Sequence, residues 1–337
     1  MSKYIVCSGC SFTRQEFRVG LDGETLNFNY DNPRMWRWPH WIQKLHPKKV
    51  VYNLGNPTND NNLIATSVIS KITELIKKGI NPKEIKVFIQ WSDMVRESFY
   101  IPQEVFDLFG EEIDLDNSEN ENVAAHTNFF ANKNKNLNKF GHYIISAGSE
   151  YKHIPSKVRK NAIESINKFM SIERATIRFY HNVLLVQNFL KQNKIDYLMF
   201  NYPRNVSLDN NHADYNWKNN YINKKVPKQI FDFKYDNPYI DYFVDNVDWD
   251  KFWFYKDENT NIGGLIDFAI MNYDYETDEI LFMEHQNDNP DGGVPKCNSA
   301  EDLMNYHKNS GGLHVGHISS QMNKKFVEKI LRKYLEN

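Results

Sequence analysis

Short β-prone runs separated by turn residues near the start of the chain predict three buried strands. The runs occupy 4–7, 50–53 and 85–89. Gly9 follows the first run and Gly55 follows the second, and glycine is a residue at which a chain turns readily. Runs of this length that are rich in Val, Ile, Phe and Tyr favour strands covered on both faces.

A helix is expected between the second and the third of these runs. From Leu63 to Ile76 apolar side chains recur at steps of three and four residues, and Gly79 ends the pattern. Strand, helix and strand in this order are typical of a parallel sheet with crossover helices. The first part of the chain therefore predicts an α/β fold.

Two long stretches interrupt this pattern, and we interpret them as insertions in a single domain that spans 1–337. Residues 97–150 are acidic and rich in Asn, so little regular structure is expected there, whereas 203–300 are rich in aromatic residues. Between the two stretches, a helix over about 156–192 precedes a fourth strand at 196–200.

The chain is expected to end in a helix. Ser319 or Ser320 can cap its first turn, and Met322, Phe326 and Leu331 follow at helical spacing. A helix with one apolar face would pack on the predicted sheet.

Composition and charge narrow the class of protein. The 337 residues carry 41 Lys and Arg against 43 Asp and Glu, a formal net charge of -2, and 14% of them are aromatic. A near-neutral balance gives no general attraction to nucleic acid, and this aromatic content is too high for a disordered chain. The sequence shows no apolar run of ~18 residues and no signal peptide, which predicts a soluble, non-secreted protein with no membrane partner.

The three cysteines and the Asn-rich composition bear on localisation. Three cysteines are too few for a disulfide framework and agree with a reducing compartment. We therefore expect a cytoplasmic protein. The high Asn content is typical of an AT-rich genome, and if that genome is a phage's, the protein belongs to the host cytoplasm or the virion. Virion or homo-oligomer contacts are then additional possible interactions.

Four segments with reactive or polar side chains follow predicted strands or precede the last helix. They are Gly9-Cys10-Ser11-Phe12-Thr13, Asn53-Leu54-Gly55, Gln90-Trp91-Ser92-Asp93 and the stretch 312–319, which contains His314 and His317. Open α/β sheets bind ligands at the carboxyl ends of their strands, so we expect these segments to meet. A serine and a histidine at one such edge favour nucleophilic catalysis.

In order and placement these segments resemble the SGNH hydrolases, also called the GDSL esterase and lipase family. The resemblance implies that Ser11 is the nucleophile, that His317 is the base and that Gly55 belongs to the oxyanion hole. The segment 59–62 is similar to a Ser-Asn segment of many distant members. The resemblance also implies a three-layer α/β/α sandwich with a small parallel sheet, flavodoxin-like in strand order, and a reaction that needs no cofactor.

The third segment departs from the family pattern. Ser92 stands where the family has an asparagine of the oxyanion hole. Losing one such donor typically lowers the rate ~10²–10³-fold. Ser92 itself, Asn61 or Gln90 could substitute for it.

The fourth segment departs as well. His314 stands where the family has the aspartate that orients the base. His317 would then be oriented by a backbone carbonyl, by His314, or by an acid from the second insertion such as Asp291 or Asp302. A serine and a histidine can still act as a dyad.

Aromatic and basic residues beside these segments have two interpretations each. Trp91 and Arg96 form either a structural pair or contacts to the substrate. The aromatic residues between Trp249 and Tyr255 form either the core of the second insertion or a platform for a carbohydrate.

The cysteines offer two alternatives to the serine mechanism, a metal site and a redox pair. Cys7 and Cys10, with His314 and His317, have ligand-like spacing for zinc, but Cys7 falls within the first predicted strand. A thioredoxin-like pair is disfavoured because that motif opens a helix after a strand. We therefore expect no bound metal.

Two functions follow from the sequence. The first is an SGNH-like serine esterase that acts on an ester or an acetylated substrate, including acetylated carbohydrates. The second is an SGNH-like framework that has lost catalysis and serves as a binding or structural module, for instance in a virion. Ser11 and His317 favour the enzyme, whereas Ser92 and His314 favour the module.

Overall fold

The computed structural model of the chain describes most of an α/β core. The described residues are 2–10, 13, 36–55, 59–92, 94, 96, 98–102, 141–145, 172–202, 237–256, 263–274, 282–283 and 317–336.

Five parallel strands form the central sheet, in the order β2-β1-β3-β6-β7. The strands are β1 (Tyr4–Ser8), β2 (Val50–Asn53), β3 (Ile85–Trp91), β6 (Asp196–Asn201) and β7 (Phe252–Trp253). Numbered along the chain, this is the 2-1-3-4-5 order of flavodoxin-like sheets. The expected parallel sheet and its strand order are confirmed.

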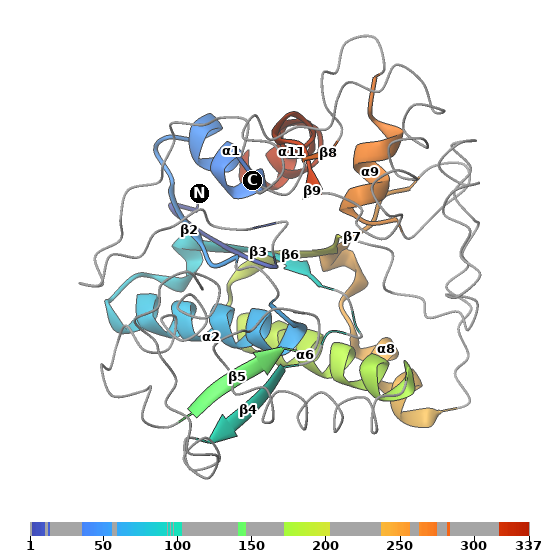
Figure 1. Cartoon of the computed structure of the whole chain (residues 1–337). Coiled ribbons are helices and arrows are strands. Elements are labelled where there is room, and N and C mark those ends of the chain that lie inside the picture. The colour runs from blue at the N-terminus through green and yellow to red at the C-terminus, as the bar shows by residue number, and fades with distance from the viewer. Residues whose placement is uncertain are drawn as a thin grey trace, which may run out of the picture.

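Helices cover both faces of the sheet (Figure 1). On one face lie α2 (Asn61–Lys77), α6 (Ile172–Gln192) and α8 (Pro238–Asn246). On the other lie α1 (Trp38–Leu45), α9 (Leu265–Met271) and the last helix, which comprises α11 (Ser320–Phe326), the π-helical turn η6 (Val327–Leu331) and α12 (Arg332–Glu336). The structure is therefore a three-layer α/β arrangement.

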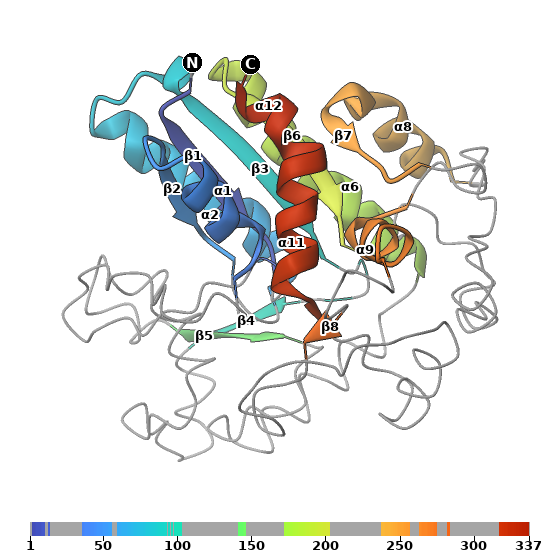
Figure 2. The same cartoon turned by 90° about the horizontal axis from the view of Figure 1, so that it is seen from above.

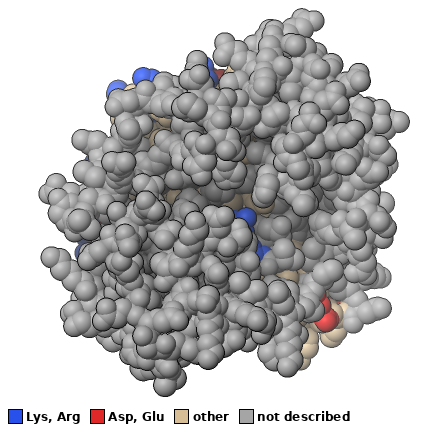
Figure 3. All heavy atoms as spheres, in the orientation of Figure 1, with Lys and Arg blue, Asp and Glu red and all other residues tan. Residues whose placement is uncertain are grey.

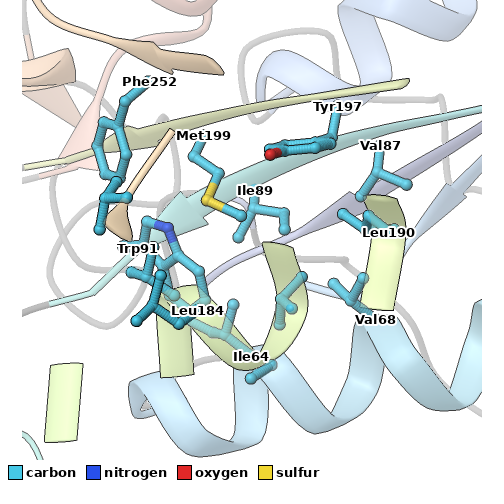
Figure 4. Close-up of a cluster of buried hydrophobic side chains, with 14 of the residues drawn as sticks. Ile64, Val68, Val87, Ile89, Trp91, Leu184, Leu190, Tyr197, Met199 and Phe252 are labelled. Carbon is cyan, nitrogen blue, oxygen red and sulfur yellow. The ribbon is translucent and has the colours of Figure 1, made fainter. Parts of the chain in front are cut away.

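Each face of the sheet has its own apolar core, because side chains of a strand alternate between the two faces. Toward α2 and α6, Ile89 and Trp91 of β3 pack with Met199 of β6, as Figure 4 shows. Toward α1 and α11, Phe88 and Phe200 pack with the helices. All seven residues of β3 are buried, as expected for the central strand of a sheet covered on both sides.

Helix α2 begins and ends as its sequence predicts. The side chain of Asp60 accepts a hydrogen bond from the N–H of Leu63, which satisfies one of the free donors of the first turn. Gly79 follows the helix with φ of 82°, a conformation that glycine adopts without strain.

The last helix is capped by Ser319. Its Oγ accepts from the N–H of Met322 at 3.2 Å. Met322 and Phe326 are fully buried on the side that faces the sheet. The predicted cap and apolar face are confirmed.

The second predicted insertion includes parts of the framework, and the range 203–300 has to be corrected. β7 (Phe252–Trp253), entered through the 3-10 turn η5 (Trp249–Lys251), completes the main sheet, and α9 packs on it. The sequence signal was hidden because a strand of two residues has no periodicity. Trp249, Phe252 and Trp253 therefore pack in the main core rather than in a separate core of the second insertion.

Short strands also occur outside the main sheet. β4 (Ser98–Pro102) pairs antiparallel with β5 (Gly141–Ile145), so the first insertion begins and ends in regular structure that the sequence did not predict. β8 (Phe282–Met283) pairs antiparallel with β9 (His317–Ile318). A further 3-10 turn, η2 (Pro82–Glu84), leads into β3.

Membrane-spanning helices and basic surface patches would each indicate a kind of partner. None of the helices described is long and apolar enough to cross a membrane. On the face in Figure 3, Lys and Arg atoms of the described residues are seen in separate places rather than as one patch.

Candidate active site

The carboxyl ends of β1 and β3 lie side by side where the strand order reverses. Ser8 at the end of β1 is in register with Ile89 of β3, and β2 lies on the other side of β1. Ligands of open α/β sheets bind outside the carboxyl ends at such a switch point. Ser11 follows β1 and Ser92 follows β3 in the chain, so two of the predicted segments leave the sheet here.

Thr13 holds the chain that follows β1. Its N–H donates to the carbonyl of Cys10 at 2.9 Å, and its Oγ1 donates to Gln90 Oε1 at 2.7 Å. Its Oγ1 also accepts from Trp38 Nε1 at 3.2 Å, and its carbonyl accepts from Asn53 Nδ2 at 2.8 Å. Thr13 is fully buried, so these bonds are shielded from water and connect β1, β2, β3 and α1.

Ser11 and His314 lie outside the described residues. Cys10 and Thr13, on either side of Ser11 and its neighbour Phe12, are both fully buried and are hydrogen-bonded to each other. The two ends of the predicted nucleophile segment are therefore held by the core.

Gly55 lies against the backbone of Thr13. A β-carbon at position 55 would come within 2.6 Å of the carbonyl carbon and oxygen of Thr13. The N–H of Gly55 donates to Asn53 Oδ1 at 2.9 Å. The glycine that the resemblance assigns to the oxyanion hole thus makes room for Thr13, and its N–H already has an acceptor within the protein.

Asn61 and Ser92 are joined directly. The N–H of Ser92 donates to Asn61 Oδ1 at 2.8 Å, and Asn61 Nδ2 donates to the carbonyl of Ser92 at 3.3 Å. Both residues are buried. The carboxamide considered as a substitute for the missing asparagine therefore lies at the end of β3, where that asparagine was expected.

Trp91 is a core residue. Its ring is fully buried and packs edge-on against Phe179 of α6, with 5.9 Å between ring centroids. Arg96 is partly exposed, and its Nε and Nη1 atoms are buried. The packing of the Trp91 ring agrees with the structural interpretation, while its Nε1 has no acceptor among the described residues.

His317 is the first residue of β9 and is partly buried. The carbonyl of the next residue, Ile318, accepts from Asn323 Nδ2 at 3.1 Å and from Arg37 Nη1 at 3.4 Å. Figure 2 shows that α11 begins at the end of the molecule toward which the parallel strands run. The segment of the predicted base therefore reaches the carboxyl edge of the sheet.

Trp38 links this segment to the chain after β1. Its Nε1 donates to Thr13 Oγ1, and its backbone N–H donates to Asn323 Oδ1 at 3.0 Å. Asn323 in turn holds the carbonyl of Ile318. One residue of α1 thus joins the segments that carry the predicted nucleophile and base.

The two described cysteines are buried thiols. Cys7 packs in the apolar cluster on the α1 face, and burial raises the pKa of its thiol well above the ordinary value. Cys10 Sγ accepts from Gln90 Nε2 at 3.3 Å. Within the described ranges, no group of three or more His, Cys, Asp or Glu side chains could hold a metal ion.

Three residues of this edge were assigned no role from the sequence, although two of them, Thr13 and Asn53, lie in the predicted segments. Thr13 and Asn53 carry the hydrogen bonds described above, and Asn201 ends β6 beside Trp91. For Asn53 and Asn201 the available signal was a polar residue at the end of an apolar run. Thr13 has no such signal, because its role arises from contacts with three distant segments.

The chemistry of this site has to be inferred from its own residues. No family model, curated protein or solved structure matches the chain. The resemblance to the SGNH hydrolases therefore stays a prediction from the motifs.

Proposed function

We propose that the protein hydrolyses an ester or acyl bond, with Ser11 as the nucleophile and His317 as the general base. The observation that carries this proposal is the Trp38 bridge, which ties the chain around Ser11 to the chain after His317 at the switch point of the sheet. This arrangement supports a dyad, because it connects Thr13, two residues after Ser11, with the chain that follows His317 at one edge of the sheet.

The proposed reaction follows the chemistry of a Ser-His dyad. Ser11 Oγ attacks the carbonyl carbon of the ester while His317 accepts the hydroxyl proton. The tetrahedral intermediate collapses, the alcohol leaves with the proton from His317, and an acyl-serine remains. His317 then accepts a proton from water, which attacks the acyl-serine, and the bond to Ser11 Oγ breaks as His317 returns the proton to this oxygen and the acid is released.

The oxyanion donors are fewer than in a complete site. The N–H of Gly55 donates to Asn53 Oδ1, so the proposed oxyanion hole lacks this donor. Because each missing donor lowers the rate ~10²–10³-fold, the proposed hydrolysis is slow.

The test is covalent labelling by a fluorophosphonate, together with hydrolysis of 4-nitrophenyl acetate. We expect the probe to label the wild-type protein, and Ser11→Ala and His317→Gln to abolish both labelling and hydrolysis. Ser8→Ala is the matched control, because Ser8 Oγ lies 2.9 Å from Ser67 Oγ inside the core. Labelling that persists in Ser11→Ala, or a wild-type protein that neither reacts nor hydrolyses, would contradict the proposal.

A binding or structural module is the second candidate, and a specific observation favours it. Both Gly55 and Asn61, which an oxyanion hole would use, make hydrogen bonds inside the protein. Such a module would be folded and stable and would not react with the fluorophosphonate. Ser11→Ala would not weaken its binding to a partner.

A further inference from the structure

Asn201, the last residue of β6, is a buried polar side chain that the fold leaves without hydrogen bonds. The residue is 2% exposed, and neither Oδ1 nor Nδ2 of its carboxamide has a partner among the residues that the structure describes. A carboxamide offers two donors and one carbonyl acceptor, and leaving them unpaired in the interior destabilises the folded state. A residue of this kind calls for an explanation.

Trp91 provides a second group of the same kind beside it. Trp91 of β3 is in register with Asn201 of β6, and residues in register on parallel strands project from the same face of the sheet. The indole Nε1 of Trp91 is also buried, with no acceptor in the described part of the chain. Figure 4 shows Trp91 within the apolar cluster that also contains Met199 and Phe252.

Other buried amides at this edge of the sheet are hydrogen-bonded. Asn53 donates to the carbonyl of Thr13, Asn61 is bonded to Ser92, and Asn323 holds both Trp38 and Ile318. Asn201 differs from these amides in lacking hydrogen bonds to the described residues, and it lies where β3 and β6 end. The end of β3 borders the switch point where ligands of such sheets bind, and β6 is the next strand along the sheet.

We propose that Asn201 and the Nε1 of Trp91 bind a neutral amide group of the substrate. The pair presents N–H donors from both residues and a carbonyl acceptor from Asn201, which complements the C=O and N–H of a secondary amide. Neither side chain carries a charge, and a charged group would lose more solvation energy in this apolar surrounding than an amide does. This inference rests on the proposed function and names a substrate class for it.

The position fits a specificity site rather than a part of the reacting centre. β6 is two strands away from β1, and neighbouring strands are ~4.8 Å apart, so the two strand ends are about 10 Å apart. An amide bound there lies several bonds from the scissile carbonyl. Asn201 would therefore select substrates without stabilising the oxyanion.

A pair of esters that differ only by an amide tests this placement. The 4-nitrophenyl esters of 6-acetamidohexanoic acid and nonanoic acid have acyl chains of equal length, and the first has its amide about six bonds from the scissile carbonyl. In Asn201→Leu we expect kcat/KM for the amide ester to fall about tenfold relative to kcat/KM for the nonanoate ester. An unchanged ratio would overturn the inference.

Thermal unfolding provides a readout that does not depend on catalysis. Asn201→Leu replaces an unpaired carboxamide with an apolar side chain of similar size, so we expect the Tm to rise by about 2–4 °C. Asn323→Leu is the matched control and should lower the Tm, because the Asn323 carboxamide is bonded to Trp38, Ile318 and Ser319. A lower Tm for Asn201→Leu would show that Asn201 is bonded within the fold and would overturn the inference.

Failure of the proposed function can be told apart from failure of this inference. If the wild-type protein hydrolyses neither ester, the proposed function fails, and binding of N-hexylacetamide decides the role of Asn201. Stabilisation of the wild-type protein by millimolar N-hexylacetamide, absent in Asn201→Leu, would support the amide site. Equal stabilisation of both proteins, or of neither, would overturn it.

Discussion

A β-carbon at position 55 would lie 2.6 Å from the carbonyl carbon of Thr13, so the backbones of Gly55 and Thr13 meet at a distance that only glycine permits. The same approach brings the Thr13 carbonyl to Asn53 Nδ2. The end of β2 and the chain after β1 are therefore locked together beside the predicted nucleophile.

Gly55→Ala is expected to destabilise the protein by about 3 kcal/mol or more, because the new methyl group meets backbone atoms, which cannot move away as a side chain can. Chemical denaturation measures the change. Gly79→Ala is the matched control. A β-carbon there meets nothing within 4 Å, and only the φ of 82° opposes it, so a loss of about 1 kcal/mol is expected. Equal losses in the two variants would refute the steric explanation.

Thr13→Val is expected to lower the free energy of unfolding by about 2 kcal/mol, because Gln90 Oε1 and Trp38 Nε1 each lose a buried partner. Since Thr13 fixes the chain beside Ser11, kcat should fall about tenfold or more, with little change in KM. Thr13→Ser keeps the hydroxyl and should restore most of kcat. If Thr13→Val lost stability but kept the wild-type kcat, Thr13 would be purely structural.

The regular part of the fold was predictable where periodicity was long or flanked by turn residues. β1, β2, β3, β6, α2 and the capped last helix occur close to the expected positions. α1 was not predicted, since its eight residues combine two tryptophans and a histidine with a proline and show little repeated pattern. β7 was missed because two residues of a strand carry no signal of their own.

The candidate site was predictable in its location but less so in its contacts. Strand ends and sheet order bring the segments of Ser11 and Ser92 to one switch point, as expected from their sequence positions. Which donor binds which acceptor could not be predicted. The bond between Gly55 and Asn53 and the four bonds of Thr13 depend on the close packing of segments distant in the chain.

His40 is expected to make the protein less stable in mild acid. Burial, with a smaller contribution from Arg37, lowers the pKa of His40 from 6.5 to about 4 in the folded state. The unfolded chain therefore binds the proton first as the pH falls, so stability is fully present above about 6.5 and is lost progressively down to about 4. The loss attributable to His40 is about 3 kcal/mol.

Denaturation at pH 7, 5.5 and 4 measures this loss. His40→Asn keeps an acceptor for the N–H of Arg37, which is bonded to His40 Nδ1 at 3.3 Å, but does not titrate. The variant should lose less stability than the wild type over this range. Parallel pH curves for the two proteins would show that His40 does not cause the acid sensitivity.

Esterase activity is expected to fall as the pH drops through the range where histidines titrate, because a protonated His317 cannot accept the Ser11 proton. The measurement is kcat/KM for 4-nitrophenyl acetate between pH 5 and 8. Activity that stays constant over this range would exclude a histidine base.

His314→Asp tests how the base is oriented. If His317 is the base, a second group has to hold its other ring nitrogen, because an unoriented imidazole would not keep the tautomer that accepts the Ser11 proton. His314 is three residues upstream, in the position of the family's acid, but a neutral histidine gives no anionic stabilisation to the imidazolium and a protonated one opposes it. We therefore expect His314→Asp to raise kcat at least severalfold at pH 7, with Ser11→Ala in the same background remaining inactive. A folded His314→Asp protein with an unchanged or lower kcat would place the orienting group elsewhere, and Asp291→Asn and Asp302→Asn would then identify it by loss of the remaining activity.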